Sequence, residues 1–131
     1  GDPSAADPVE RESSRADAFI PCYAVMDMDG RYVHQGSLMN ITGSDAKRPD
    51  LTAWNNVKPD TPPCFLFHTA FDDVVPVENS LHMAKALRAH GVPFSLHVFP
   101  HGGHGVSMGL GTKLADAFPE LLRAFLADLG F

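Results

Sequence analysis

The residues best suited to hydrolytic chemistry lie in one short stretch, HVFPHGGHGVSMG, which ends in a G-x-S-x-G pattern. This pattern is typical of the turn that carries a hydrolase nucleophile, provided that an acid and then a histidine follow the serine along the chain. No histidine follows Ser107. The required order therefore fails, and we interpret the match at Ser107 as accidental.

An aspartate and a histidine in two neighbouring loops offer a different kind of chemistry. Asp72 and Asp73 follow the apolar run CFLFHT, and His101 and His104 follow the run FSLHVFP among three glycines. If both runs are strands of a parallel sheet, their carboxyl ends meet at one edge, where ligands bind. An aspartate that orients a histidine, and a histidine that takes a nucleophile's proton, are two members of a hydrolytic triad. An alternative is that the aspartates cap the next helix.

A metal site is the competing use of the histidines. His97, His101 and His104 fall close together in the sequence, but their spacing matches neither the helical H-E-x-x-H pattern nor a Cys/His zinc pattern. We therefore expect no metal site. His34, in YVHQGS, is expected to face either solvent or the pocket.

The elements that must position these residues follow from the hydrophobic pattern. Continuous apolar runs bounded by turn residues are typical of strands buried on both faces, and apolar residues at every third or fourth position are typical of helices. The pattern predicts strands at Ala18–Met26, Cys64–Thr69 and Phe94–Pro100, and helices over about 78–90 and Phe118–Leu129.

The order of these elements indicates a fold class. Residues 27–63 are rich in Gly and Pro, which predicts a long loop with at most a short helix around Ser37–Ile41. Buried strands that alternate with helices are typical of an α/β protein with a parallel sheet and flanking helices. Gly91 is well placed to end the first long helix.

The length and charge of the chain exclude some classes of binding partner. The 131 residues fit one domain, and a net charge of −6 without a basic patch argues against nucleic acid and anionic membranes. The first 17 residues are polar and lack the order of a signal peptide. Cys22 and Cys64 lie in apolar runs, which is typical of buried free thiols.

The stretch Pro62–Gly109 resembles the C-terminal half of α/β-hydrolase esterases of the acetyl xylan esterase and feruloyl esterase type, which are related to the prolyl oligopeptidase and dienelactone hydrolase groups. It contains H-T-A-F-D-D-V-V-P, close to the family's H-G-x-x-D-x-x-V-P with Thr69 in place of glycine, and FPHGGHG, close to F-P-x-G-x-H-G. The resemblance carries the family's acid onto Asp72, rather than Asp73, and its catalytic histidine onto His104.

The resemblance also implies an overall organisation and an activity. Residues 1–131 would form a single partial domain, the C-terminal part of a three-layer α/β-hydrolase fold. The reaction would be hydrolysis of acetyl, feruloyl or other small esters, without a cofactor. The serine would belong to the first half of the fold and so lie outside this chain, because Ser37, in HQGSL, lacks the first glycine of the pattern.

Two partner classes follow from this interpretation. The substrate would be a small-molecule or polysaccharide ester, and the chain would either self-associate or pair with a separate N-terminal half, with no role for nucleic acid or membranes. The alternative function is a non-catalytic α/β module, or a subunit that pairs with such a half.

Overall fold

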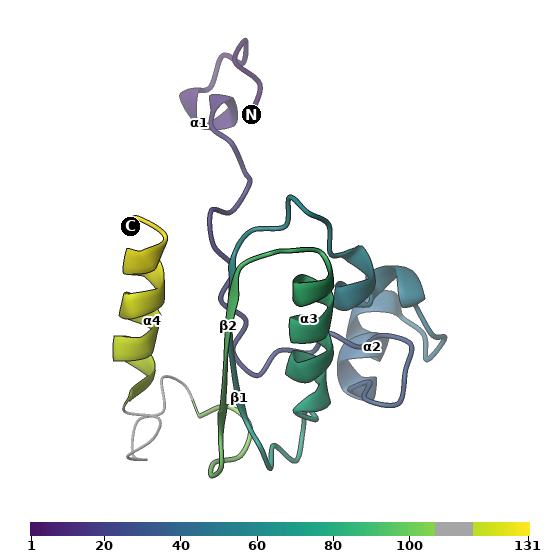
Figure 1. The fold of residues 1–131 in the computed structure, drawn as a ribbon. Coiled ribbons are helices and arrows are strands. Elements are labelled where there is room, and N and C mark those ends of the chain that lie inside the picture. Colours follow the sequence, from purple (N-terminus) through teal and green to yellow (C-terminus); the bar gives the residue numbers. More distant parts are fainter. Residues whose placement is uncertain (107–116) are drawn as a thin grey trace.

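The computed structural model, which describes residues 1–106 and 117–131, is organised around two parallel strands (Figure 1). Strand β1 spans Cys64–Thr69 and strand β2 spans Phe94–Phe99, with Cys64 opposite Phe94 and Thr69 opposite Phe99. Helix α3, Glu78–Ala89, connects them, and Gly91 beyond its end has a φ of 69°, a conformation that glycine adopts without strain. The prediction of two parallel strands joined by a helix is therefore confirmed.

The predicted strand at Ala18–Met26 is only partly formed. Its residues lie beside β1, but they make two isolated parallel bridges, from Phe19 and Cys22, and no regular strand. Pro21 has no backbone N–H to donate to a ladder, and Tyr23 has a φ of 40°, which turns the chain out of the extended conformation. The sheet edge is therefore irregular where the sequence predicted a strand.

Helices cover both faces of the sheet, as Figure 1 shows, with α3 on one side and α4, Phe118–Asp128, on the other. Alternate residues of β1 point to opposite faces, so each helix meets its own apolar cluster. The cluster on the α3 side includes Cys64, Leu66, Met83, Leu87 and Val92. The cluster on the α4 side includes Phe65, Phe67, Phe99 and Phe118. The three-layer arrangement is thus confirmed.

The short helix predicted around Ser37–Ile41 is confirmed, and the long loop also contains two helical turns that the sequence did not predict. Helix α2 spans Gln35–Thr42, and two 3-10 turns follow, η1 at Pro49–Leu51 and η2 at Ala53–Asn56. A short helix, α1 at Pro8–Arg11, lies near the N-terminus, apart from the rest of the molecule in Figure 1. Within the part of the chain that the structure describes, no helix is long and apolar enough to cross a membrane.

Buried polar side chains attach the loop after Met26 to the core. Asn79, in the first turn of α3, accepts hydrogen bonds from the backbone N–H groups of Met26 and Asp27, both at 2.8 Å, and donates to the carbonyl of Tyr32 at 3.1 Å. Asp27 accepts from three further amides of its own loop, at 2.7–3.1 Å. These bonds satisfy backbone groups that would otherwise be buried unpaired, which is costly.

Candidate active site

The structure brings an aspartate and a histidine together at the carboxyl ends of β1 and β2. Asp72 lies in the loop after β1, and His104 lies in the loop after β2. The Nδ1 atom of His104 is 2.9 Å from Oδ2 of Asp72, so an Nδ1–H group donates a charge-assisted hydrogen bond to the carboxylate. The Asp72 side chain is completely buried and that of His104 is 32% exposed.

The surroundings of Asp72 favour its ionised form. Burial by itself would raise the pKa of the carboxyl group, but the amides of Val75 and Val74 donate to Oδ1 at 2.9 and 3.0 Å, and His104 donates to Oδ2. The net effect is a pKa below the ordinary value for aspartate. Asp72 is therefore a fixed negative charge beneath the imidazole at neutral pH.

The loop that carries His104 approaches the end of β1 closely at Gly102. Gly102 has a φ of 121°, and a Cβ atom at this position would lie 3.0 Å from the methyl carbon of Thr69. The hydroxyl of Thr69 donates to the carbonyl of Gly103 at 3.1 Å. Thr69 therefore ties the end of β1 directly to the histidine loop.

Tyr23 contacts the imidazole and was not among the residues that the sequence analysis singled out. Its ring lies edge-on to that of His104, with 5.1 Å between ring centroids, and also meets Phe67 edge-on at 6.1 Å. A φ of 40° is rare for a bulky residue and is costly unless the surroundings enforce it. No sequence motif could have indicated this contact, because Tyr23 and His104 are far apart in the chain.

The Asp72–His104 pair can carry out the proton transfers of a hydrolytic reaction, but it does not include a nucleophile. Because the Nδ1–H of His104 points to Asp72, the neutral ring presents Nε2 as an acceptor, and within residues 1–106 and 117–131 no hydrogen bond to Nε2 is formed. A partly exposed Nε2 can take a proton from a nucleophile and return it to a leaving group. Asp72 holds the ring in the required tautomer.

The other residues that the sequence analysis considered lie outside this pair. Asp73 and His101 are exposed, and within the described residues their side chains form no hydrogen bond or ion pair with Asp72 or His104. His34 is the N-cap of α2, where its Nδ1 accepts from the backbone N–H of Ser37 at 3.2 Å and lies 2.9 Å from the serine hydroxyl. This contact is a helix cap. Ser107 lies outside the described residues.

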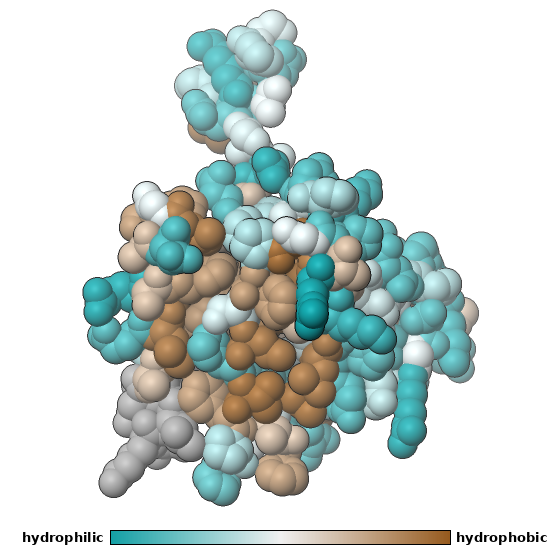
Figure 2. All heavy atoms as spheres, in the orientation of Figure 1, coloured by the Kyte–Doolittle hydropathy of each residue, from teal (hydrophilic) through white to brown (hydrophobic). Residues whose placement is uncertain are grey.

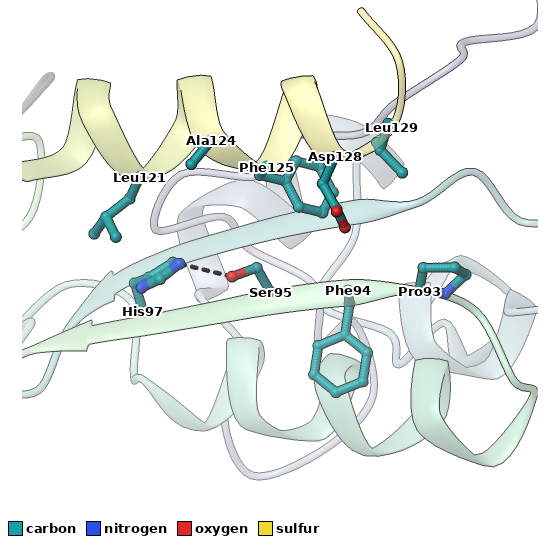
Figure 3. Close-up of a pocket in the computed structure, with 9 residues that line it drawn as sticks. All are labelled: Pro93, Phe94, Ser95, His97, Leu121, Ala124, Phe125, Asp128 and Leu129. Carbon is teal, nitrogen blue, oxygen red and sulfur yellow. Dashed lines mark hydrogen bonds between the residues drawn. The ribbon is translucent and has the colours of Figure 1, made fainter.

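A second serine–histidine contact lies in a cleft of about 470 Å³ between β2 and α4 (Figure 3). Ser95 Oγ is 2.7 Å from Nε2 of His97, and burial lowers the pKa of His97, which favours the neutral ring. The side chains stand next to each other on one face of β2 in Figure 3, and Asp128 lines the same cleft. Among the described residues no carboxylate bonds to His97, so the contact lacks the third member of a triad.

Among residues 1–106 and 117–131, no group of three or more His, Cys, Asp and Glu side chains is arranged to hold a metal ion. Cys22 and Cys64 are free thiols, and burial raises the pKa of Cys64 to about 11, so this thiol is protonated at neutral pH.

The layered sheet and the loops at the carboxyl ends of its strands define the C-terminal part of an α/β-hydrolase fold. The chain belongs to the prolyl oligopeptidase family, whose sequence profile matches residues 12–123. A solved structure with the same fold, an acetyl ester-xyloside bifunctional hydrolase from Caldicellulosiruptor lactoaceticus, is 41% identical and superposes with a TM-score of 0.89 over 100% of this chain and 49% of the other. A carboxylesterase from Lactobacillus plantarum is 27% identical, with a TM-score of 0.74 over 90% of this chain and 46% of its own.

Two curated proteins are also similar in sequence to this chain. The acetylxylan esterase of Xylanibacter ruminicola is 34% identical over 122 residues, which is 88% of this chain and 25% of the relative. Endo-1,4-beta-xylanase B of Butyrivibrio fibrisolvens is 42% identical over 99 residues, or 73% of this chain and 15% of the relative. The chain thus spans a quarter or less of these curated relatives and about half of the solved structures.

Proposed function

We propose that this chain supplies the acid and the base of a serine carboxylic ester hydrolase. The observation that carries the proposal is the 2.9 Å hydrogen bond from Nδ1 of His104 to Asp72, which leaves Nε2 of the imidazole at a partly exposed edge of the sheet. This is the orientation that a triad histidine needs.

The reaction needs a serine from outside the described residues. The imidazole Nε2 of His104 takes the proton from the serine hydroxyl while the serine oxygen attacks the ester carbonyl, and the same proton then passes to the departing alcohol. A water molecule then attacks the acyl-serine ester in the same way, with His104 again as the base, and releases the carboxylic acid product and the free serine. Asp72 remains ionised throughout and stabilises the imidazolium ion that forms in between.

The proposed substrates are acetyl esters of xylose-containing carbohydrates or similar small esters. The support comes from the printed names of two relatives, an acetylxylan esterase and an acetyl ester-xyloside hydrolase. The negative charge of this chain agrees with a neutral substrate, because a polyanion would be repelled.

We propose that the serine belongs to a complementary half of the same fold, which pairs with the open edge of this sheet. Figure 2 shows hydrophobic residues over the face between α4 and α3, where β2 forms one edge of the sheet. The segment Ala18–Met26 borders β1 at the opposite edge, where the family fold would continue. Phe19 and Ile20 of this segment are 44% and 36% exposed. An apolar face beside an unpaired edge favours association with a further strand and helix.

A simple assay separates this proposal from catalysis by Ser107. The isolated chain should hydrolyse p-nitrophenyl acetate no faster than its His104→Ala variant, because a base without a nucleophile has nothing to activate. Hydrolysis that depends on His104 and disappears in Ser107→Ala would contradict the proposed external serine. The alternative function, a non-catalytic module, predicts no labelling by fluorophosphonates even after a serine-bearing half is supplied.

A further inference from the structure

His68 is a buried, polar residue next to the Asp72–His104 pair, for which the proposed reaction gives no role. It lies in β1 on the face toward α3 and is completely buried. Both ring nitrogens are engaged: Nε2 is 2.9 Å from the carbonyl oxygen of Val75, and Nδ1 is 2.8 Å from the hydroxyl of Ser80, which is also completely buried.

These partners determine where the proton of His68 lies. A carbonyl oxygen can only accept, so Nε2 of His68 must carry a hydrogen and donate it to Val75. In the neutral ring Nδ1 is then an acceptor, and the hydroxyl of Ser80 donates to it. Ser80 therefore holds the Nε2–H tautomer of the buried imidazole.

The same N–H group approaches the candidate acid. Nε2 of His68 is 3.4 Å from Oδ2 of Asp72, the oxygen that accepts from His104. This distance is too long for a strong hydrogen bond, but the positive end of the N–H dipole favours the ionised carboxylate.

His68 also holds the loop that orients Asp72. The backbone N–H of Val75 donates to Oδ1 of Asp72, while the carbonyl of Val75 accepts from His68. Val75 is thus hydrogen-bonded through its N–H to the carboxylate of Asp72 and through its carbonyl to the ring of His68. Movement of the ring would therefore shift the carboxylate relative to His104.

We propose that His68 and Ser80 form a positioning pair, which fixes the carboxylate of Asp72 and thereby the Nδ1–H tautomer of His104. This inference rests on the proposed function, because the tautomer of His104 matters only if His104 is a catalytic base. The test needs neither the serine nor a substrate, so its result can be interpreted even if the chain proves not to be part of an esterase.

The test measures the tautomer of His104 in the full chain by ¹⁵N NMR of the imidazole nitrogens, at about pH 8.5, where an ordinary histidine with a pKa of about 6.5 is neutral. In His68→Asn the shorter amide keeps a partner for Ser80 but loses the donor at the Nε2 position. His68→Gln keeps a donor near that position.

We expect His68→Asn and Ser80→Ala to lower the ratio of Nδ1–H to Nε2–H tautomer of His104 by about three- to tenfold, the change that one lost hydrogen bond produces. His68→Gln should restore most of the ratio. Two matched controls should leave it unchanged: His82→Asn, on the exposed side of α3, and Ser95→Ala, which removes a serine hydroxyl from another histidine.

Three results would overturn the proposal. The first is a wild-type tautomer ratio in both His68→Asn and Ser80→Ala. The second is an equal effect of the Asn and Gln replacements at His68, because a general packing defect would not distinguish them. The third is loss of the folded ¹H–¹⁵N fingerprint in Ser80→Ala, which would make the pair a requirement for folding rather than for positioning.

Discussion

At the scale of single residues, the candidate acid links the site to the stability of the fold. Asp72 has a pKa below its ordinary value, so the folded chain binds its proton less tightly than the unfolded chain does. The ionised group therefore stabilises the fold fully above about pH 4, the ordinary aspartate value, and this contribution is lost as the pH falls through the lower pKa of the folded state.

Asp72→Asn should consequently destabilise the chain at pH 7 more than at pH 3. Urea midpoints at the two pH values, followed by the fluorescence of Trp54, would measure the difference. Asp73→Asn is the matched control, because the side chain of Asp73 is exposed and its loss should change neither midpoint appreciably. A destabilisation by Asp72→Asn that is the same at both pH values would contradict the assignment of its ionised form.

Tyr23 leads to a second prediction, which concerns backbone strain. Tyr23 has a φ of 40°, and in left-handed geometry a residue with a Cβ atom is less stable than glycine by about 1–2 kcal/mol. Glycine usually destabilises relative to alanine by about 0.5–1 kcal/mol, so Tyr23→Gly should be about 1 kcal/mol more stable than Tyr23→Ala.

The neighbouring position gives the control for this comparison. Ala24 has no positive φ, so Ala24→Gly should follow the usual order and destabilise. Thermal unfolding of the variants would show the reversal at Tyr23. If Tyr23→Gly were the less stable of the two Tyr23 variants, the strained conformation would be ruled out.

The sequence could predict some of these residues and not others. Asp72 and His104 each lie within a motif of fixed spacing, so the sequence itself marks them. Tyr23 contacts His104, which is distant in the chain, and neither residue type nor spacing indicates this contact. His68 begins the same motif as Asp72, but the motif does not show its contacts with Ser80 and Val75. Thr69 departs from the family's glycine, and only the structure shows its hydrogen bond to the histidine loop.

At the scale of elements, Asn79 is the residue that joins α3 to the segment after Met26. Asn79→Ala would leave the backbone N–H groups of Met26 and Asp27 without their acceptor, at a cost of about 1–3 kcal/mol for a buried unsatisfied group. These two amides should therefore exchange with solvent much faster, while the amides of β1 remain protected.

Hydrogen exchange read by NMR would test this prediction, with Asn55→Ala as the control. Asn55 donates only to the carbonyl of Pro49 in an exposed turn, so its loss should leave Met26 and Asp27 protected. Unchanged exchange at Met26 and Asp27 in Asn79→Ala would show that α3 does not hold this segment.

Elements with a clear hydrophobic pattern were predicted accurately from the sequence, and elements without one were not. β1, β2, α3 and α4 have clear apolar runs or helical periodicity, and their observed bounds lie within a residue or two of those expected. The segment at Ala18–Met26 has the composition of a strand, but Pro21 and the turn at Tyr23 break its pairing. The turns η1 and η2 span only three and four residues, which is too short for a hydrophobic period to predict them.

At the scale of the whole molecule, the open sheet edge predicts association. Within the described residues, the backbone groups of Ile20 and Cys22 that point away from β1 make no backbone hydrogen bond, and Ile20 is partly exposed. The outer side of α4 adds Leu122, Leu126 and Phe131 to an apolar groove. Such an edge is a template for another chain.

We therefore expect the isolated chain to be a dimer or larger assembly, or to be only partly folded. Sedimentation velocity over about a hundredfold range of concentration would measure this. Ile20→Lys should weaken association, since a lysine on an edge opposes pairing, whereas Met39→Lys, on the exposed side of α2, should not. A single monomeric species with a cooperative thermal transition would show instead that the chain covers its own edge.

A chimera would test the role of His104 directly: in it, this chain replaces the segment that it matches in the Caldicellulosiruptor lactoaceticus hydrolase. We expect the chimera to be labelled by a fluorophosphonate and to hydrolyse p-nitrophenyl acetate. His104→Ala should lower its kcat/KM by about 10,000-fold or more, as removal of a triad base does. A folded, active chimera whose rate is unchanged by His104→Ala would contradict the assignment of His104 as the catalytic base.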